Sequence, residues 1–496
     1  MINFLKKPTT LIYSLILFFS TMMFQNHLKI NDPDLFWHIK TGEYIWMNKT
    51  IPHIDVLSWW GQGKELVWVS HEWLSDAVIY LLHQSIGFKG LLIVTGITFL
   101  LLIYVLTKIM SLRIDKHFPY FTESKKILVL TFFMFLVSFS LAPFISIRPQ
   151  VLSFLLISIC ILLYEKEKSW LTLPIILLGV NWHGGFWIIY LIIALYYSIP
   201  RKQYWIPILV ILLSFATPHT YYNFLYPFLG TLDSTMANNI SEWMAPKLFV
   251  SDTTSMMISA IILLLIFIPK KKMPLWDMLF LTAFSIQMIR GIRFLLFFPL
   301  IGFIILLSYV DYKKIKDVFI KGINSISKKS NENKTVLYND STIRDIMFII
   351  TIIVFLSSAF YIGMIGKNLT NSTEKDLINL MPLEAIEFLK ENPEYQERLC
   401  NEYGLGGFLL FNDIPSMVDG RSDPFVETFN PDKDILADYF DSLYHLKESP
   451  EVFFEEHDIT NIIWKKNFKL YHYIRDNEDF DIVYEDDDIF IAIYDK

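Results

Sequence analysis

Residues 89–110 read KGLLIVTGITFLLLIYVLTKIM, an apolar run whose only charges, Lys89 and Lys108, lie near its ends. A helix of this length spans about 33 Å, which matches the hydrocarbon core of a lipid bilayer. Similar runs recur along the chain, so we predict an α-helical protein that crosses a membrane about eleven times. The other predicted spans are residues 8–25, 127–145, 149–164, 170–183, 185–199, 204–217, 253–269, 275–289, 294–310 and 345–366.

The composition agrees with a polytopic membrane protein. Of 496 residues, 53% are hydrophobic and 19% are charged, whereas soluble proteins average about 25% charged. Aromatic residues make up 16%, which suits a chain that anchors many helices at membrane interfaces. The net charge is −7, the acidic residues gather in the tail, and no sustained basic face exists, so a nucleic-acid partner is not expected.

Basic residues fall in alternate connections between the predicted spans, and this pattern predicts the orientation of the chain. Lysine and arginine are enriched in the cytoplasmic loops of membrane proteins. With an odd number of spans, every basic cluster lies on one side, which places the N-terminus in the cytoplasm and the C-terminus outside the cell membrane. The clusters lie at residues 6–7, 108–126, 166–168, 201–202, 270–272 and 313–329.

The predicted organisation has two parts. A transmembrane domain covers residues 1–366, with outer loops at residues 25–73 and 218–252. Residues 367–496 are polar enough to form a small extracytoplasmic α/β domain. Its predicted elements are helices at residues 383–390 and 435–446, a strand at 461–464, and a hairpin of 481–484 with 489–494.

The first outer loop holds the densest set of residues that carry chemistry. It reads NDPDLFWH over residues 31–38 and SHEWLSD over residues 70–76. Asp32 and Asp34 follow the first span, where paired carboxylates can act as a general base or hold a divalent cation beside a phosphate. The alternative is that they only end a helix in water. Because Pro33 favours extended backbone before it, the two side chains need not face the same way.

The aromatic residues of this loop are predicted to form a belt at the membrane interface, where their amphipathic rings are favoured. They are Phe36, Trp37, Trp59, Trp60, Trp68 and Trp73.

Three arginines, Arg148, Arg290 and Arg293, lie at the outer ends of spans, where the charge rule requires no positive residue. A guanidinium pairs with phosphate bidentately, so these residues are candidates for binding a lipid-linked phosphate. The alternative is that they reach toward the outer headgroups. His183 is either catalytic or an interhelical hydrogen-bonding residue, and Glu242 belongs either to a lid or to an interfacial helix.

Several segments recur in this order in a group of bacterial multi-pass proteins that resembles the GT-C superfamily of membrane glycosyltransferases. They are DPDLFWHIKTGEYI (32–45), SHEWLSDAVIYLL (70–82), RPQ (148–150), NWHGG (181–185) and SEW (241–243). The tail segment GLGGFLLFNDIPSMVDGRSDPF (404–425) is similar to the extracytoplasmic domain of such proteins.

The resemblance implies a GT-C-like enzyme that moves a sugar from a polyprenyl-phosphate-linked donor to an envelope glycan, lipid or protein on the outer face. It implies that Asp34, or Asp32, activates the acceptor or binds a divalent metal such as Mg²⁺ or Mn²⁺. The residues expected to bind the donor and its phosphate are His38, Glu72, Arg148, His183, Glu242, Arg290 and Arg293.

Two other functions stay open at this point. A transporter or flippase of a lipid-linked substrate would use the same arginines, but such proteins hold charges near the middle of their spans, whereas most ionisable residues here lie at span ends. A non-catalytic subunit of envelope assembly would use the acidic tail to bind a partner.

Overall fold

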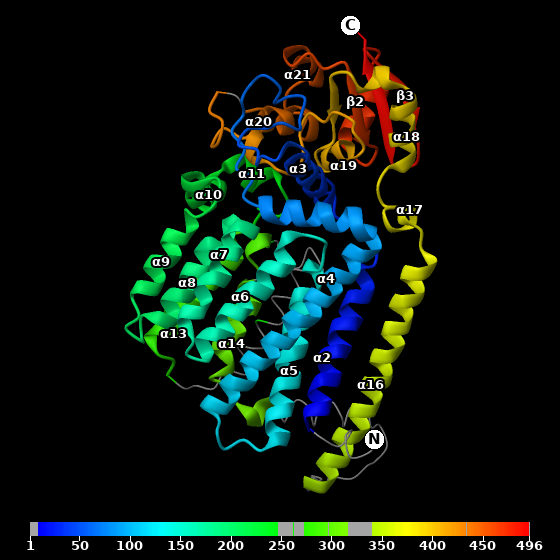
Figure 1. Ribbon diagram of the computed structural model, residues 1–496. Helices are drawn as coiled ribbons and strands as arrows, with labels where there is room; N and C mark the ends of the chain where they lie inside the picture. The colour runs from blue at the N-terminus through cyan, green and yellow to red at the C-terminus, as the bar shows by residue number, and fades with distance from the viewer. Residues whose placement is uncertain are drawn as a thin grey trace.

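The computed structural model describes residues 8–246, 261, 272–295, 297–315, 340–432 and 434–495. Apolar helices run side by side along most of its length, and the C-terminal strands and short helices lie over one end of them (Figure 1). The first helix, α2 (Pro8–Phe24), packs against α16 (Asp340–Asn371), the helix that leads into the C-terminal part.

Most of the predicted spans are helical in the structure. Among the described residues, the other helices of the bundle are α4 (Trp73–His117), α5 (Glu123–Leu141), α6 (Pro149–Glu165), α7 (Thr172–Trp182), α8 (Trp187–Ser198), α9 (Trp205–Ser214), α13 (Leu275–Arg290), and π-helical η6 (Phe298–Gly302) continuing into α14 (Phe303–Leu307). Among the described residues, three helices are long and apolar enough to cross a membrane, and several shorter apolar helices accompany them. The predicted span at 253–269 lies, apart from Ile261, outside the described residues, so the count of eleven stays a prediction.

Helix α4 begins well before the span predicted at 89–110. Its first part lies across the end of the bundle, beneath the C-terminal part, and the chain then turns down into the bundle (Figure 1). The turn is at Gly87, whose φ of 63° and ψ of −170° are open only to glycine. The sequence did not show this part of the helix because Ser75, Asp76 and His83 interrupt its apolar pattern.

The first outer loop contains a helix, α3 (Asp34–Asn48), which packs against α4 and against α19 (Gly406–Phe411). The approach to α4 depends on Gly42, because a Cβ there would lie 2.1 Å from the backbone oxygen of Asp76. This loop is therefore enclosed by protein on two sides.

The predicted aromatic belt is wrong for the centre of this loop. Phe36 is fully buried against Phe88 and Phe408, with ring centroids 6.1 and 4.7 Å away. Trp37 is also buried, and the ring of Trp68 lies 4.5 Å from the guanidinium of Arg421. The C-terminal part covers these rings, a long-range contact that a local sequence pattern does not reveal.

The outer aromatic residues of the loop, Trp59, Trp60 and Trp73, are half-buried and contact other parts of the protein rather than forming a belt. Trp59 donates to the backbone oxygen of Leu399 at 2.9 Å, and Trp73 donates to the Asn181 side chain at 3.3 Å. Trp60 stacks edge-on against His457, with ring centroids 5.0 Å apart.

Residues 374–495, here called the C-terminal segment, form a four-stranded sheet of order β1-β2-β4-β3 with short helices around it. The strand β1 pairs parallel with β2, and the other two pairs are antiparallel, with Cys400 opposite Ile462 and Ile463 opposite Ile491. The strands are β1 (Leu399–Asn401), β2 (Asn461–Lys465), β3 (Phe480–Glu485) and β4 (Ile489–Tyr494). The helices are α17 (Glu374–Leu377), α18 (Leu383–Glu391), α19, α20 (Leu436–Tyr439), π-helical η10 (Phe440–Tyr444), α21 (Pro450–Glu456) and α22 (Lys469–Arg475).

Three predicted elements are confirmed: the hairpin of 481–484 with 489–494, the strand at 461–464 and the helix at 383–390. The helix predicted at 435–446 is α20 followed by η10. Strand β1 was missed because three residues are too few to show an alternating pattern.

The sidedness of the chain stays a prediction, and the structure shows how to test it. Both native cysteines, Cys160 and Cys400, are free and buried, so neither is a reporter in the folded protein. We expect a cysteine at the exposed position Glu448 to react with a membrane-impermeant maleimide in intact cells. A cysteine at Lys168, which is exposed in a predicted cytoplasmic turn, should react only after permeabilisation. The reverse order would overturn the orientation.

Candidate functional site

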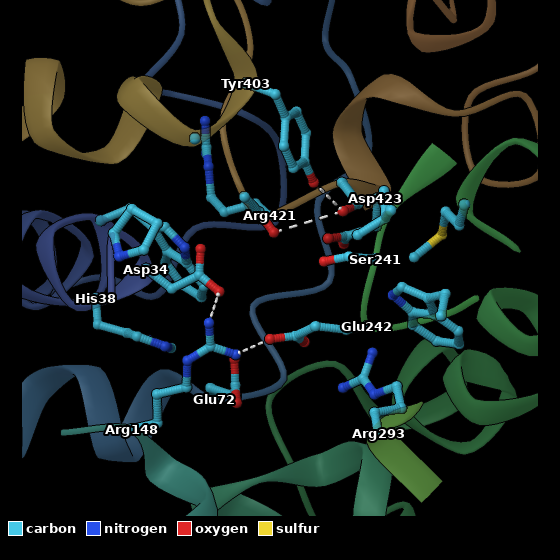
Figure 2. A pocket seen from close by; sticks show the side chains of 18 of the residues that line it. Asp34, His38, Glu72, Arg148, Ser241, Glu242, Arg293, Tyr403, Arg421 and Asp423 are labelled. Carbon is cyan, nitrogen blue, oxygen red and sulfur yellow. Dashed lines mark hydrogen bonds and ion pairs between the residues drawn. The ribbon is translucent and has the colours of Figure 1, made fainter. Parts of the chain in front are cut away.

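A polar cavity of about 470 Å³ lies between the end of the helix bundle and the C-terminal segment (Figure 2). Five separate parts of the chain form its walls: the first outer loop with the start of α4, the start of α6, the second outer loop, the turn at Ile292–Phe294 and the C-terminal segment. Its charged lining residues are Asp34, Glu72, Asp76, Arg148, Glu242, Arg293, Glu402, Arg421 and Asp423.

Arg148 is the centre of the charged network. It directly precedes α6, and its Nη2 lies 2.8 Å from Asp34 Oδ2 and 2.7 Å from Asp32 Oδ1. Its Nε donates to the other oxygen of Asp32, and its Nη1 donates to Glu242. Figure 2 shows Asp34 and Glu242 both pointing toward the guanidinium. One arginine therefore joins three carboxylates from the two outer loops.

Both aspartates of the DPD sequence face Arg148. Pro33 has helical backbone angles (φ −67°, ψ −22°) and precedes the first turn of α3, while the Asp32 carboxylate accepts from the Asp34 backbone N–H at 3.2 Å. This local geometry turns the two side chains in the same direction. Asp34 lines the cavity, whereas Asp32 does not.

The electrostatics of Asp34 suit a base at neutral pH. Burial raises the pKa of Asp34 to about 7, Arg148 opposes this rise, and the charges of Asp32 and Glu242 add to it. The side chain still keeps 22% of its surface open. For Glu242, burial also raises the pKa, but Arg148 and Arg293 outweigh it and hold the pKa below its usual value. The pKa of Asp34 therefore lies in the range where a general base works best, whereas that of Glu242 does not.

The C-terminal segment covers Asp34 closely. A Cβ at Gly420 would lie 2.2 Å from Asp34 Oδ1 and 3.1 Å from Trp37 Nε1, so only glycine leaves room for this carboxylate. Beside it, the Tyr403 hydroxyl and the Ser422 hydroxyl are 2.6 Å apart. The segment therefore shapes the space around the proposed base.

Arg421 ties the C-terminal segment to the first outer loop. Its Nε and Nη2 donate to the two oxygens of Asp419 at 2.7 and 2.6 Å, and its Nη1 donates to Asp55 at 2.6 Å. The side chains of Arg421, Asp419 and Asp55 are all fully buried. The Asp55 carboxylate also accepts from the backbone of Leu57 and Ser58, at 3.1 and 3.4 Å.

The other predicted residues of the first loop lie at the floor of the cavity. His38 is buried, with its Nδ1 2.6 Å from Asp76 Oδ1. Glu72 has one oxygen 3.4 Å from His183 Nε2, and burial raises the pKa of Glu72 to about 8. His183 is buried where α7 ends, so it does not line the polar cavity.

A second cavity, of about 460 Å³, adjoins the polar one and is lined mainly by apolar side chains of α8, α10 (Thr220–Leu232) and α13. The two cavities share five lining residues: His71, Gln150, Tyr226, Trp243 and Arg293. The guanidinium of Arg293 lies 4.2 Å above the Trp243 ring, and within the described part of the chain no carboxylate lies at ion-pair distance from it. Arg290 is exposed and lines only the apolar cavity.

Sequence reasoning placed Asp34, Arg148, Glu242 and Arg293 on the outer side, and the structure brings them around one cavity. It missed Tyr403, Arg421 and Asp423. The signal was the DGRSD sequence at 419–423, where charges alternate directly after the apolar pair Met417 and Val418. Charged side chains that are buried among apolar residues need charged or hydrogen-bonding partners, and such buried groups are often found at functional sites.

The helix bundle and the C-terminal segment together have the fold of a solved membrane oligosaccharyltransferase, so the expected resemblance is borne out at the level of the fold. The apo crystal structure of the Archaeoglobus fulgidus oligosaccharyltransferase superposes with a TM-score of 0.52 at 9% identity, over 92% of this chain and 69% of that one. ArnT from Cupriavidus metallidurans, bound to undecaprenyl phosphate, aligns over 98% of this chain and 97% of its own at 11% identity, with a TM-score of 0.35. No family model and no curated protein matches the chain.

Proposed function

We propose that the protein is a membrane glycosyltransferase that moves a sugar from a polyprenyl-phosphate-linked donor to a cell-envelope glycan, lipid or protein on the outer face. The observation that carries this proposal is the pair of adjoining cavities, one apolar and one polar, with Arg293 in the wall of both. The donor carries a long hydrocarbon chain, a phosphate and a sugar in that order. An apolar cavity, an arginine and a polar cavity suit these three groups in the same order. The fold supports the same class of reaction.

In this proposal the prenyl chain lies in the apolar cavity, the phosphate lies beside Arg293, and the sugar enters the polar cavity. Asp34 takes the proton of an acceptor hydroxyl while the hydroxyl oxygen forms a bond to the anomeric carbon of the sugar. The bond between that carbon and the phosphate oxygen breaks, and the prenyl phosphate leaves with the electron pair. Arg293 stabilises the charge that develops on the leaving phosphate.

Arg148 holds the carboxylate of Asp34 in place. It was predicted to bind phosphate, and that role stays untested. Each of its three nitrogens is engaged by a carboxylate, so we propose that its main task is to orient Asp34 and Glu242. The same guanidinium lies between the carboxylates of Asp32 and Asp34, where Mg²⁺ or Mn²⁺ was predicted. Because the guanidinium already pairs with both carboxylates, the observed arrangement does not fit a metal at that place.

Replacement of Arg293 should test the phosphate site. We expect Arg293→Ala to weaken binding of a short prenyl phosphate, such as farnesyl phosphate, by about 1.5–3 kcal/mol, the usual contribution of a hydrogen bond to a charged group. Isothermal titration of the purified protein measures this change. Arg398→Ala, at an exposed arginine beside Trp59, is the matched control and should bind as wild type does. Equal affinity in Arg293→Ala and wild type would leave only contact with headgroups as its role.

A further inference from the structure

Two histidines and a glutamate converge between the two cavities. The Nε2 of His183 lies 3.4 Å from Glu72 Oε1, and the Nε2 of His71 lies 3.9 Å from Glu72 Oε2. One ligand atom from each of the three residues lies within 4.8 Å of the others. Ligand atoms held about 2.1 Å from a tetrahedral metal ion are on the order of 3.4 Å apart, so this spacing is close to that of a three-residue metal site.

The orientation of His71 matches that of a metal ligand. Its Nδ1 lies 3.1 Å from the backbone oxygen of Val69, so this nitrogen carries the proton and donates to the carbonyl. The Nε2 lone pair then faces Glu72 and His183. Metal-bound histidines in proteins almost always donate their second ring nitrogen in this way, because the bond fixes both the tautomer and the ring orientation.

The backbone holds the two ligand-bearing segments together before any ion binds. The Gly184 N–H donates to the backbone oxygen of His71 at 2.8 Å, and the Ser75 hydroxyl donates to the backbone oxygen of Trp182 at 2.9 Å. A Cβ at Gly184 would lie 3.2 Å from the Cβ of His71 and 1.8 Å from the side chain of Asn223. The glycine that follows His183 therefore permits the close contact on which the convergence depends.

The cluster also has an open side. His71 lines both cavities, Glu72 lines the polar cavity, and His183 lines the apolar one. Three protein ligands with a fourth position open to a cavity are typical of catalytic rather than structural zinc sites. Arg293, which contributes to both cavities, lies in the same wall.

We propose that His71, Glu72 and His183 bind one divalent transition-metal ion, of which Zn²⁺ fits the two imidazoles and one carboxylate best, and that its open position accepts a phosphate oxygen of a prenyl phosphate. This site is separate from Asp32 and Asp34, whose carboxylates Arg148 occupies. Only the identity of the phosphate ligand rests on the proposed function. The metal site itself rests on the geometry of the three side chains.

The first experiment measures metal content and Co²⁺ spectra of the purified protein in detergent. We expect about one zinc ion per chain after dialysis against Zn²⁺, and visible Co²⁺ absorption of a four-coordinate site after exchange. Glu72→Gln and His183→Ala should each lower metal affinity roughly 100-fold or more, since loss of supporting groups alone costs 10–100-fold. His219→Ala should keep the metal, because His219 is a buried histidine that packs on His53 and is not part of the cluster.

The outcomes are decisive in both directions. Wild-type protein that retains no zinc and gives no Co²⁺ spectrum would overturn the site, and this result does not depend on whether any variant folds. Zinc that persists in the Glu72→Gln, His183→Ala double variant would also overturn it. Addition of farnesyl phosphate should change the Co²⁺ spectrum, and an unchanged spectrum would remove the open position from the proposal. Asp34→Asn should keep the metal, so a failure of the metal site and a failure of the glycosyltransferase proposal give different results.

Discussion

Asp34→Asn should lower the rate of sugar transfer roughly 10²–10⁴-fold, which is the usual loss when a general base is removed. Asparagine keeps the size of the side chain and can still accept a hydrogen bond from Arg148, whose Nη2 lies 2.8 Å from the Asp34 carboxylate. It cannot accept a proton from an acceptor hydroxyl. Comparing the envelope glycans and lipids of wild type, a deletion strain and the variant measures the effect in cells.

The pH dependence of the reaction is a second test of Asp34 as the general base. The base is the ionised carboxylate, and burial places the pKa of Asp34 at about 7. The rate should therefore rise with pH through about 7 and level off above it, because the protonated acid below that pH cannot accept a proton. The small residual rate of Asp34→Asn should lack this rise.

The control for Asp34 is Asp413→Asn. Asp413 is 81% exposed and pairs with Lys40 at the surface, so its loss should leave the glycan profile unchanged. If Asp34→Asn restores the full profile to the deletion strain, Asp34 is not the base. If Asp32→Asn alone abolishes the product, the two roles are exchanged. An unchanged profile in the deletion strain itself would favour a non-catalytic role in envelope assembly.

Arg421→Met should destabilise the protein by about 3–5 kcal/mol, the cost of removing one partner from a buried ion pair. Methionine fills much of the same volume, but it leaves the fully buried carboxylates of Asp419 and Asp55 without their cation. Thermal unfolding in detergent, followed by tryptophan fluorescence, should show a lower midpoint. The ring of Trp68, 4.5 Å from Arg421, makes this signal sensitive to the region.

Two further variants separate charge from packing. Arg475→Met removes an exposed arginine that pairs with its neighbour Asp476 and lies near the Tyr471 ring at the surface, and its unfolding midpoint should match that of wild type. Adding Asp419→Asn to Arg421→Met should recover part of the lost stability, because one of the two uncompensated charges is removed as well. A midpoint for Arg421→Met equal to wild type would show that the ion pairs of Arg421 with Asp55 and Asp419 do not contribute to stability.

The sequence was sufficient to predict most of the apolar helices of the bundle and the end of the bundle at which the site lies. Long apolar runs such as 127–145 are typical of membrane-spanning helices. The alternation of lysines and arginines predicts which span ends share a surface. Asp34, Arg148, Glu242 and Arg293 were selected because they lie at those ends, and they do line one cavity. Their roles in the reaction stay proposals.

The contacts of the C-terminal segment were beyond a reading of local patterns. The burial of Phe36 and Trp68 depends on Phe408 and Arg421, which come several hundred residues later. Likewise, the sharp turn of α4 follows from the backbone of Gly87, and the sequence around it shows only a polar stretch before an apolar run. The carboxylates around Arg148 come from two loops whose shapes are set by these distant contacts.

The ion pair between Asp55 and Arg421 limits how early during synthesis the walls of the polar cavity can come together. The two residues are 366 positions apart, and at about 5–20 residues per second the ribosome needs roughly 20–70 s to synthesise the chain between them. During that interval the helices from α4 to α16 are made one after another, and Tyr403, Gly420 and Arg421, which lie around Asp34 in the folded protein, are made after them. In a nascent chain that lacks the C-terminal segment, the Asp34 carboxylate is therefore not yet covered by Gly420.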